Sequence, residues 1–339
     1  MFSKRFIILS LISISLFAGC IPSKPLLTPD YATPEATATS LSSIKHQLTY
    51  VMPFELNGTQ YQGIYAIEVL CFEIKTLCFD SPELLSKIPE ESGENTLAPY
   101  GDISSYSWSL DGKKIAFSAS SLEGKIDIFI ADWNGGNLKN ITMSPEREIF
   151  PSWSVDSQLM YTLCSSGRCR TIISDQYGEQ KKVLPINSDT DFATWMPSGK
   201  QVLFIGADDQ SINQIFVANA DGSEIMQVTH ATENNIVSPV STNGSSLFFT
   251  KSQANQAQNF NYSVFSIDIT GKVEKAITVD DYLISAGPAV ALFRDWLAFE
   301  QGRNTYDIYV SSFDGKDAYK ITDNEGDKRK PAWRVIGYP

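Results

Sequence analysis

Six short segments built around Trp, or around Val in its place, recur along this chain at nearly constant spacing. The anchors are separated by 45, 42, 45, 50 and 43 positions, and they are Trp108, Trp153, Trp195, Val240, Val290 and Trp333. A period of about 40 to 50 residues, filled with short alternating strands, is typical of propellers and stacked repeat arrays. The repeat therefore predicts an all-β fold before any single residue is interpreted.

Each repeat has the same four parts when the anchors are aligned. An inner strand that holds the anchor (FPSWS, FATWM) is followed by a turn (LDGKK, PSGKQ), a second strand (KIAFSA, QVLFIG) and a third strand (DIFIAD, DIYVSS). A turn that contains glycine then leads to a short outer strand, which ends at Thr142, Thr229, Thr278 or Thr322. Asp-Gly and Asn-Gly turns between alternating strands are strong signals for antiparallel hairpins.

This unit resembles the WSPDGKxIAF…DIYVxDxDGxxxxxLT repeat of TolB-type propellers, over about residues 98–339. The turn after the anchor departs from that pattern in WSVDS, WMPSG and VSTNG, whereas the strands keep it. Five complete units run from about residue 98 to 330, and the sixth anchor, Trp333, stands alone. Residues 47–97 contain strands without an anchor. We therefore predict a six-bladed β-propeller of four-stranded blades, closed by a composite blade from the N-terminal strands and the C-terminal strand.

The first residues have the pattern of an export signal, with Lys4 and Arg5 before the apolar run 6–18. That run is shorter than the roughly 20 residues that a membrane span needs. It leads into LFAGC, which resembles the lipobox of bacterial lipoproteins, with Phe17 where Leu is usual. The resemblance implies a signal peptide at 1–19, lipidation of Cys20 and anchoring on the periplasmic or extracellular face of a membrane. The alternative is an ordinary cleaved signal with an incidental cysteine.

Residues 20–46 contain four prolines and the run TPEATATSLSS, so their apolar content is too low to order a segment. We expect a disordered tether there and the propeller over residues 47–339. The four remaining cysteines form two close pairs, Cys71 with Cys78 and Cys164 with Cys169. In an exported protein such pairs indicate hairpin disulfides. A zinc site is disfavoured because neither of the two histidines has a metal-ligand spacing to a cysteine.

The chain is acidic, with 27 Lys and Arg against 39 Asp and Glu and a formal net charge of −12. Loss of the predicted signal would remove Lys4 and Arg5 and bring the charge to −14. Nucleic acid and anionic membranes attract clustered Lys and Arg. We therefore expect no nucleic-acid partner, and membrane association through the lipid alone.

Catalytic motifs are missing from the sequence. It contains no GxSxG, GxxxxGK[ST], HExxH or GxGxxG pattern. His230 follows an outer strand in a loop and His46 lies at the edge of the tether, so neither is expected to act as a base. The sequence indicates no cofactor and no metal site, and a calcium site in DNEGDK lacks the EF-hand pattern.

Acidic residues gather in two classes of connection that a propeller places on one rim: those between second and third strands, and those from an outer strand to the next inner strand. We predicted a binding rim from these acids, although each alone could simply be solvated. The candidate residues are Asp189, Asp191, Asp208, Asp209, Asp280, Asp281, Asp323, Glu325 and Asp327. The longest insertion, residues 251–263, lies on the same expected rim.

Three functions remain open on this evidence. The first is a non-catalytic, monomeric module that binds a protein or peptide through its rim or channel mouth. The second is a propeller-type lyase or glycan hydrolase, which needs two carboxylates about 5 to 9.5 Å apart at the channel mouth. The third is carbohydrate binding, which exposed aromatic residues such as Phe260, Tyr262 and Tyr282 along a groove would favour.

Overall fold

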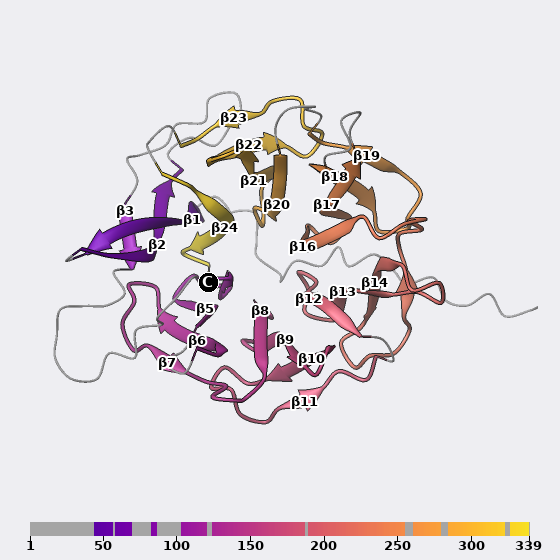
Figure 1. The fold of residues 1–339 in the computed structure, drawn as a ribbon, viewed down its shortest axis with the longest axis horizontal. Coiled ribbons are helices and arrows are strands. Elements are labelled where there is room, and N and C mark those ends of the chain that lie inside the picture. Colours follow the sequence, from indigo (N-terminus) through magenta and orange to yellow (C-terminus); the bar gives the residue numbers. More distant parts are fainter. Residues whose placement is uncertain are drawn as a thin grey trace, which may run out of the picture.

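The fold is a closed ring of six antiparallel sheets. The computed structural model describes residues 44–56, 58–69, 83–86, 103–120, 124–186, 189–254, 260–278, 284–322 and 326–338. These residues form 24 β-strands and no helix. Figure 1 shows the sheets arranged around a common centre, so the predicted six-bladed propeller is confirmed. No described segment is a helix long and apolar enough to cross a membrane.

The blades are numbered here by the order of their inner strands, and strands are given from the centre outward. Blade 1 contains β4 (Ser105–Trp108), β5 (Lys114–Ser120), β6 (Ile126–Asp132) and β7 (Lys139–Asn140). Blade 2 contains β8 (Arg147–Trp153), β9 (Leu159–Ser165), β10 (Arg168–Ser174) and β11 (Lys182–Val183). Blade 3 contains β12 (Thr190–Trp195), β13 (Gln201–Ala207), β14 (Asn213–Asn219) and β15 (Met226–Gln227).

The other three blades follow the same plan, with one exception in chain order. Blade 4 contains β16 (Ile236–Thr242), β17 (Ser246–Ala254), β18 (Phe260–Asp268) and β19 (Glu274–Ala276). Blade 5 contains β20 (Ile284–Val290), β21 (Trp296–Gly302), β22 (Tyr306–Ser312) and β23 (Tyr319–Lys320). Blade 6 contains β24 (Arg329–Ile336), β1 (Lys45–Leu56), β2 (Thr59–Glu68) and β3 (Glu83–Ser86).

Blade 6 is the predicted composite blade. Its inner strand β24 comes from the C-terminal end of the chain and pairs antiparallel with β1, with Leu48 opposite Trp333. Arg334 strengthens this closure because its Nε donates to the Gly112 carbonyl of blade 1 at 2.7 Å and its Nη1 to Gln47 at 2.8 Å. The outer strand is β3, and residues 70–82, within the predicted N-terminal set of strands, lie outside the described residues.

The anchors pack between blades, as their periodicity predicted. All six lie on inner strands and are at most 9% exposed. Trp333, for example, packs with Leu48 and Trp296, while its Nε1 donates to the Ala289 carbonyl of blade 5 at 3.0 Å. The core is therefore a series of apolar layers between neighbouring sheets rather than one central cluster.

A hydrogen-bond pattern that recurs between repeats ties the third strand to the outer one. The hydroxyl of the threonine after the outer strand accepts a backbone N–H at the start of the third strand, at 3.0 Å for Thr142 and Ile128 and at 3.0 Å for Thr322 and Ile308. The same hydroxyl donates to Asp127 or Asp307, which open their third strands. The recurrent Thr is thus a structural part of the unit.

The N-terminal boundary of the propeller lies two residues earlier than predicted, because β1 begins at Lys45. His46 was expected at the edge of a tether but is only 2% exposed. Its Nε2 lies 2.7 Å from the Leu292 carbonyl, and its ring contacts Trp296 and Trp333 edge-on. Burial lowers the pKa of His46. Residues 1–43, with the predicted signal, Cys20 and most of the tether, lie outside the described residues.

Candidate functional site

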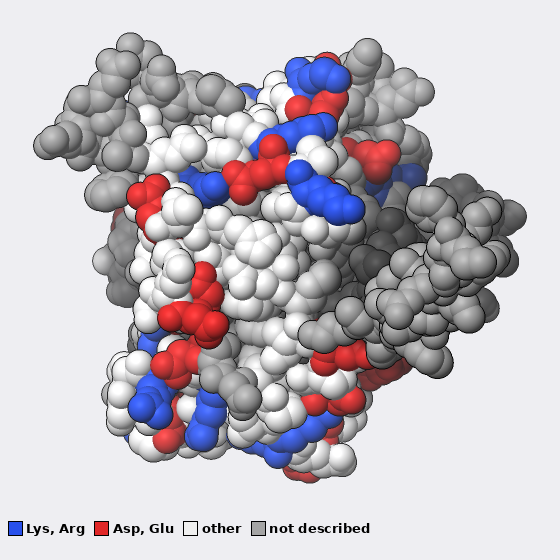
Figure 2. All heavy atoms as spheres, turned by 90° about the vertical axis from the view of Figure 1, so that its right-hand side faces the viewer, with Lys and Arg blue, Asp and Glu red and all other residues white. Residues whose placement is uncertain are grey.

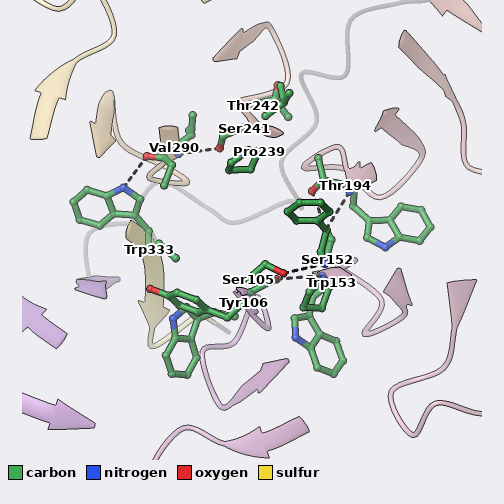
Figure 3. A pocket seen from close by; sticks show the side chains of 18 of the residues that line it. Ser105, Tyr106, Ser152, Trp153, Thr194, Pro239, Ser241, Thr242, Val290 and Trp333 are labelled. Carbon is green, nitrogen blue, oxygen red and sulfur yellow. Dashed lines mark hydrogen bonds between the residues drawn. The ribbon is translucent and has the colours of Figure 1, made fainter. Parts of the chain in front are cut away.

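A cavity of about 550 Å³ runs between the six inner strands along the axis of the ring. Figure 3 shows its wall, to which every inner strand contributes. Prolines recur in this wall, one on or next to five of the inner strands: Pro151, Pro197, Pro239, Pro288 and Pro331. Serine, alanine and proline side chains alternate with Tyr106, Phe150 and Phe192 in this wall, while the large anchors pack into the layers between blades.

Serine and threonine hydroxyls link consecutive inner strands around the cavity. Ser107 Oγ accepts the N–H of Trp153 at 3.4 Å, and Ser152 Oγ accepts that of Trp195 at 3.2 Å. Ser241 Oγ accepts the N–H of Val290 at 2.9 Å, as drawn in Figure 3. A hydroxyl that accepts one bond keeps its own O–H as a donor. The wall can therefore offer hydrogen-bond donors to acceptor groups of a ligand.

The described part of the cavity wall contains two charged residues, and these two residues contact each other. Among the described residues that line it, Glu300 is the only acid and Lys330 the only base. Glu300 accepts the backbone N–H of Lys330 at 2.8 Å and pairs with Arg329 at 3.4 Å. Lys330 Nζ in turn donates to the Ile103 carbonyl. The two carboxylates that a glycan hydrolase or lyase needs at the channel mouth are not found in this described wall.

The predicted rim is partly assembled in blade 3. Asp189 and Asp191 lie at the start of β12, while Asp208 and Asp209 lie in the β13–β14 turn on the same side of the ring. Between Leu184 and Thr250 the one Lys or Arg is Lys200, in the turn after β12 on the opposite side. Blade 3 therefore presents an acidic sector on this rim, formed by Asp189, Asp191, Asp208, Asp209 and Glu233.

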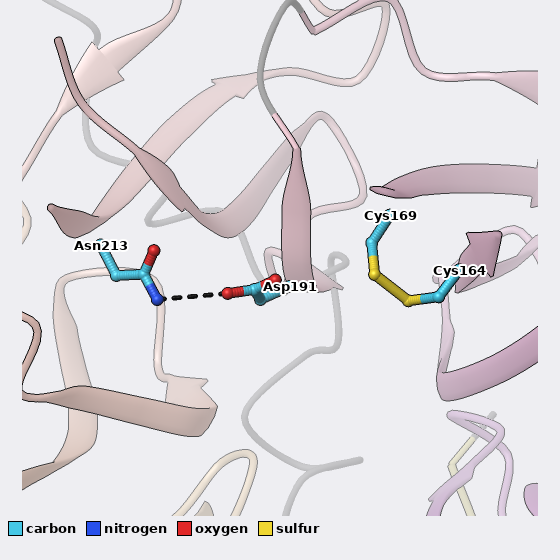
Figure 4. Close-up of a disulfide and its surroundings, with 4 residues drawn as sticks. All are labelled: Cys164, Cys169, Asp191 and Asn213. Carbon is cyan, nitrogen blue, oxygen red and sulfur yellow. Dashed lines mark hydrogen bonds between the residues drawn. A yellow bond between two sulfur atoms is a disulfide. The ribbon is translucent and has the colours of Figure 1, made fainter. Parts of the chain in front are cut away.

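Two of these acids have structural roles in their own loops. Asp208 accepts the N–H of Ile212 at 3.0 Å and the side-chain amide of Gln214 at 2.9 Å, which lowers its pKa. Asp191 accepts the side-chain amide of Asn213 at 3.2 Å, a contact drawn in Figure 4. Asp189, Asp209 and Glu233 are exposed, so they are the acids of this sector best placed to meet a partner.

Of the remaining candidate acids, the structure describes Asp327 alone, and it lies in another part of the ring. Asp327 lies before β24, where it accepts the N–H of Tyr306 at 2.8 Å and pairs with Arg329 at 2.9 Å. Asp280, Asp281, Asp323 and Glu325 lie outside the described residues. On the outer side of the molecule shown in Figure 2, acidic and basic side chains are interspersed.

Blade 2 carries the opposite charge on the same rim. A disulfide joins Cys164 and Cys169 across β9 and β10, with an S–S distance of 2.03 Å (Figure 4). The predicted pairing of these two cysteines is confirmed, whereas Cys71 and Cys78 lie outside the described residues. Arg168 and Arg170 are exposed beside the disulfide. Sequence reasoning missed this pair because it counted bases only in the outer-to-inner connections.

Other candidates for chemistry remain unsupported in the described part of the chain. No group of three or more His, Cys, Asp or Glu side chains there could hold a metal ion. His230 is exposed, 3.2 Å from the side-chain amide of Gln227. Of the aromatics considered for carbohydrate, Tyr262 is half-buried on β18, and the structure describes neither Tyr282 nor the side chain of Phe260.

Comparison with solved structures supports the fold. TolB from Acinetobacter baumannii has a TM-score of 0.66 at 19% identity, and the match covers 85% of this chain and 66% of that one. Hydrazine synthase from Kuenenia stuttgartiensis has a TM-score of 0.65 at 13% identity, covering 88% of this chain and 48% of the other. A putative TolB from Agrobacterium tumefaciens has a TM-score of 0.58 at 13% identity, covering 88% and 99%.

The chain spans slightly less than two thirds of the Acinetobacter protein, whereas its match with the Agrobacterium protein covers nearly all of that chain. No protein-family model matches the sequence, and no curated protein matches it either. At such identities the shared property is the six-bladed propeller itself.

Proposed function

We propose that this chain is a non-catalytic propeller of the cell envelope that binds a protein or peptide through its rim and channel mouth, anchored by a lipid on Cys20. The observation that supports binding best is the channel wall, which offers hydroxyl donors while its one carboxylate is engaged by Arg329 and Lys330. Such a wall can hold a ligand, but it supplies no free acid or base for catalysis. The fold shared with two TolB proteins is consistent with an envelope location.

The rim adds a means of choosing a partner. Its acidic sector on blade 3 and the basic hairpin of blade 2 are neighbours around the ring. Opposite charges on adjacent blades favour a partner with the complementary arrangement and disfavour partners that bring like charges together. We therefore place the partner's basic region over blade 3.

Removal of the exposed acids of blade 3 should slow binding. We expect the triple variant Asp189→Asn, Asp209→Asn, Glu233→Gln to associate roughly tenfold more slowly at low salt than the wild type, because it loses electrostatic steering. The salt dependence of the association rate should flatten. The measurement is association kinetics with the partner that the mature domain captures from solubilised envelopes.

A matched variant on the opposite side of the ring controls for net charge. Asp156, Glu179 and Glu224 are exposed in turns there and can be replaced by Asn, Gln and Gln. Asp111, Asp221 and Asp314 are unsuitable, because each accepts hydrogen bonds within its own turn. If both triple variants associate at the same rate at low salt, blade 3 is not the binding face.

The lipid anchor is tested separately at Cys20. Growth with a fatty-acid analogue should label the wild type, and Cys20→Ser should abolish the label because the thiol is the acylated group. The variant should also leave the membrane fraction, since the acidic domain has no electrostatic attraction to anionic lipid. Equal labelling of the two proteins would rule out the lipoprotein assignment.

A further inference from the structure

The repeat places two opposite charges at equivalent buried positions. Glu148 lies five residues before Trp153, and Lys328 lies five residues before Trp333. Each is 1% exposed, and in each inner strand the residue two positions later has a left-handed backbone, Phe150 with φ 56° and Lys330 with φ 57°. The same local geometry therefore presents a carboxylate in blade 2 and an ammonium in blade 6.

In the interface between blades 5 and 6, the buried charge of the lysine is paired with an opposite charge. Lys328 Nζ lies 3.3 Å from Asp307 Oδ1 at the start of the third strand of blade 5. Asp307 also accepts the hydroxyl of Thr322 at 2.8 Å and pairs with Lys320 at 2.7 Å. A buried charge is tolerated when an opposite charge and hydrogen bonds compensate it.

The interface between blades 1 and 2 has an aspartate at the same position in the repeat, but in the described part of the chain no lysine lies opposite it. Asp127 is the counterpart of Asp307 and is 3% exposed. It accepts the side-chain amide of Asn140 at 2.8 Å and the hydroxyl of Thr142 at 3.4 Å. Across this interface Asp127 faces Glu148, at the position where Asp307 faces Lys328 in the other interface. Two buried carboxyl groups therefore lie in the same interface.

Few groups around Glu148 can balance its charge. Its Oε1 accepts the hydroxyl of Ser144, and within the described residues its Oε2 has no hydrogen-bond partner. Within the described residues, the titratable or charged groups that face it, or share its side of the sheet, are Asp127 on β6, Glu146 in the preceding connection, Tyr161 on β9, Arg170 on β10 and Lys181 before β11. Among them Lys181 favours the anion, as the Ser144 hydroxyl does, and Arg170 is exposed.

Burial is the largest influence on this carboxyl group. It raises the pKa of Glu148 to about 7, with Asp127 and Glu146 adding to the rise and the Ser144 hydroxyl opposing it. The folded protein therefore holds this proton up to neutral pH, whereas the unfolded chain releases it near pH 4.5. The protonated Glu148 therefore stabilises the folded state fully below pH 4.5, and this stabilisation is lost as pH rises through 7.

We propose that protonation of Glu148 controls the contact between blades 1 and 2 and, through it, the rim connection formed by residues 141–147. We call this contact the Glu148 joint. The Ser144 hydroxyl can donate to either form of the side chain, so the neutral form keeps this connection docked because it does not repel Asp127. The ionised side chain faces Asp127 without a counter-charge, so it draws water into the wall and loosens the connection. The physical joint stands on the repeat geometry, and its meaning as regulation of a binding rim rests on the proposed function.

The test compares Glu148→Gln, a neutral isostere, with the wild type in urea unfolding from below pH 4.5 to above pH 7. In the wild type we expect this group to raise the unfolding equilibrium constant on the order of 100-fold over that range. Glu148→Gln should lose that part of the pH dependence, and the half-buried control Glu146→Gln should keep most of it. Equal pH dependence in wild type and Glu148→Gln would overturn the proposal.

A second variant and a local readout sharpen the result. Glu148→Lys copies the arrangement of Lys328 with Asp307, so above pH 7 it should be more stable than the wild type. Amide exchange at residues 143–147, corrected for intrinsic rates, should accelerate above pH 7 in the wild type and not in Glu148→Gln. Should Glu148→Lys fail to fold, Glu148→Gln still decides the question. Stabilisation of the wild type at high pH by an added divalent cation would contradict a proton-only joint.

None of these measurements needs a binding partner. A negative result at Glu148 therefore does not argue against the proposed binding rim. A negative result with the rim variants does not argue against the joint. If both hold, partner association should fall above pH 7 in the wild type and be independent of pH over this range in Glu148→Gln.

Discussion

Deletion of residues 331–339 is expected to destabilise the propeller by more than the loss of any single core side chain. The deletion removes most of β24, and with it the contacts of Trp333 with Leu48 and Trp296. It also removes both hydrogen bonds of Arg334, one to Gly112 of blade 1 and one to Gln47 on β1. Removing one large core side chain costs about 3 to 5 kcal/mol. Since β1 would also become an unpaired edge, the loss in free energy of unfolding should exceed that range.

The measurement is urea unfolding of the shortened and complete domains. Deletion of residues 337–339 is the control, because it leaves β24 (Arg329–Ile336) in place. A protein shortened after Lys330 that melts within a degree or two of the complete domain would show that β24 does not close the ring.

The second large effect is expected at Gly112, in the turn between β4 and β5. Its backbone has φ +66°, and a Cβ built there would lie 1.9 Å from the carbonyl oxygen of Val335 in β24. Gly112→Ala therefore combines left-handed backbone strain of about 1 to 2 kcal/mol with a clash against backbone that cannot rotate away. We expect a total loss of about 3 kcal/mol or more in the free energy of unfolding.

Gly124→Ala separates the two causes. Gly124 also has a left-handed backbone, at φ +74°, but a Cβ there would meet nothing within 4 Å. This variant should lose only the strain, about 1 kcal/mol. If the two substitutions destabilise the domain equally, the approach of the Gly112 turn to β24 is looser than the structure indicates.

The fold could be predicted because its signals are local and repeated. The alternation in KIAFSAS and the Trp or Val anchors recur often enough to outweigh the irregular turns. Trp333 without a following unit and strands at residues 47–97 without an anchor indicated the composite blade, and β24 does pair with β1.

The site was less predictable because it depends on which face each residue takes. A bulge follows Ile149 in β8, and side-chain direction at such points cannot be counted from an alternating pattern. Glu148 was expected in an outer-to-inner connection, the class in which acids were expected on the rim, yet it lies on β8 and is buried. His46 was placed beside the tether, yet two tryptophans from distant parts of the chain enclose it. Alignment of Glu148 with Lys328 by distance from their anchors would have been the one available signal.

The closure of blade 6 also sets an order of events during synthesis. Arg334 and Gln47, which hold the two ends of the ring together, are 287 positions apart in the chain. The first strand to leave the ribosome therefore waits for one of the last before its sheet is complete. Until then blades 1 to 5 can form only an open arc with two free ends, in which β1 lacks its partner β24.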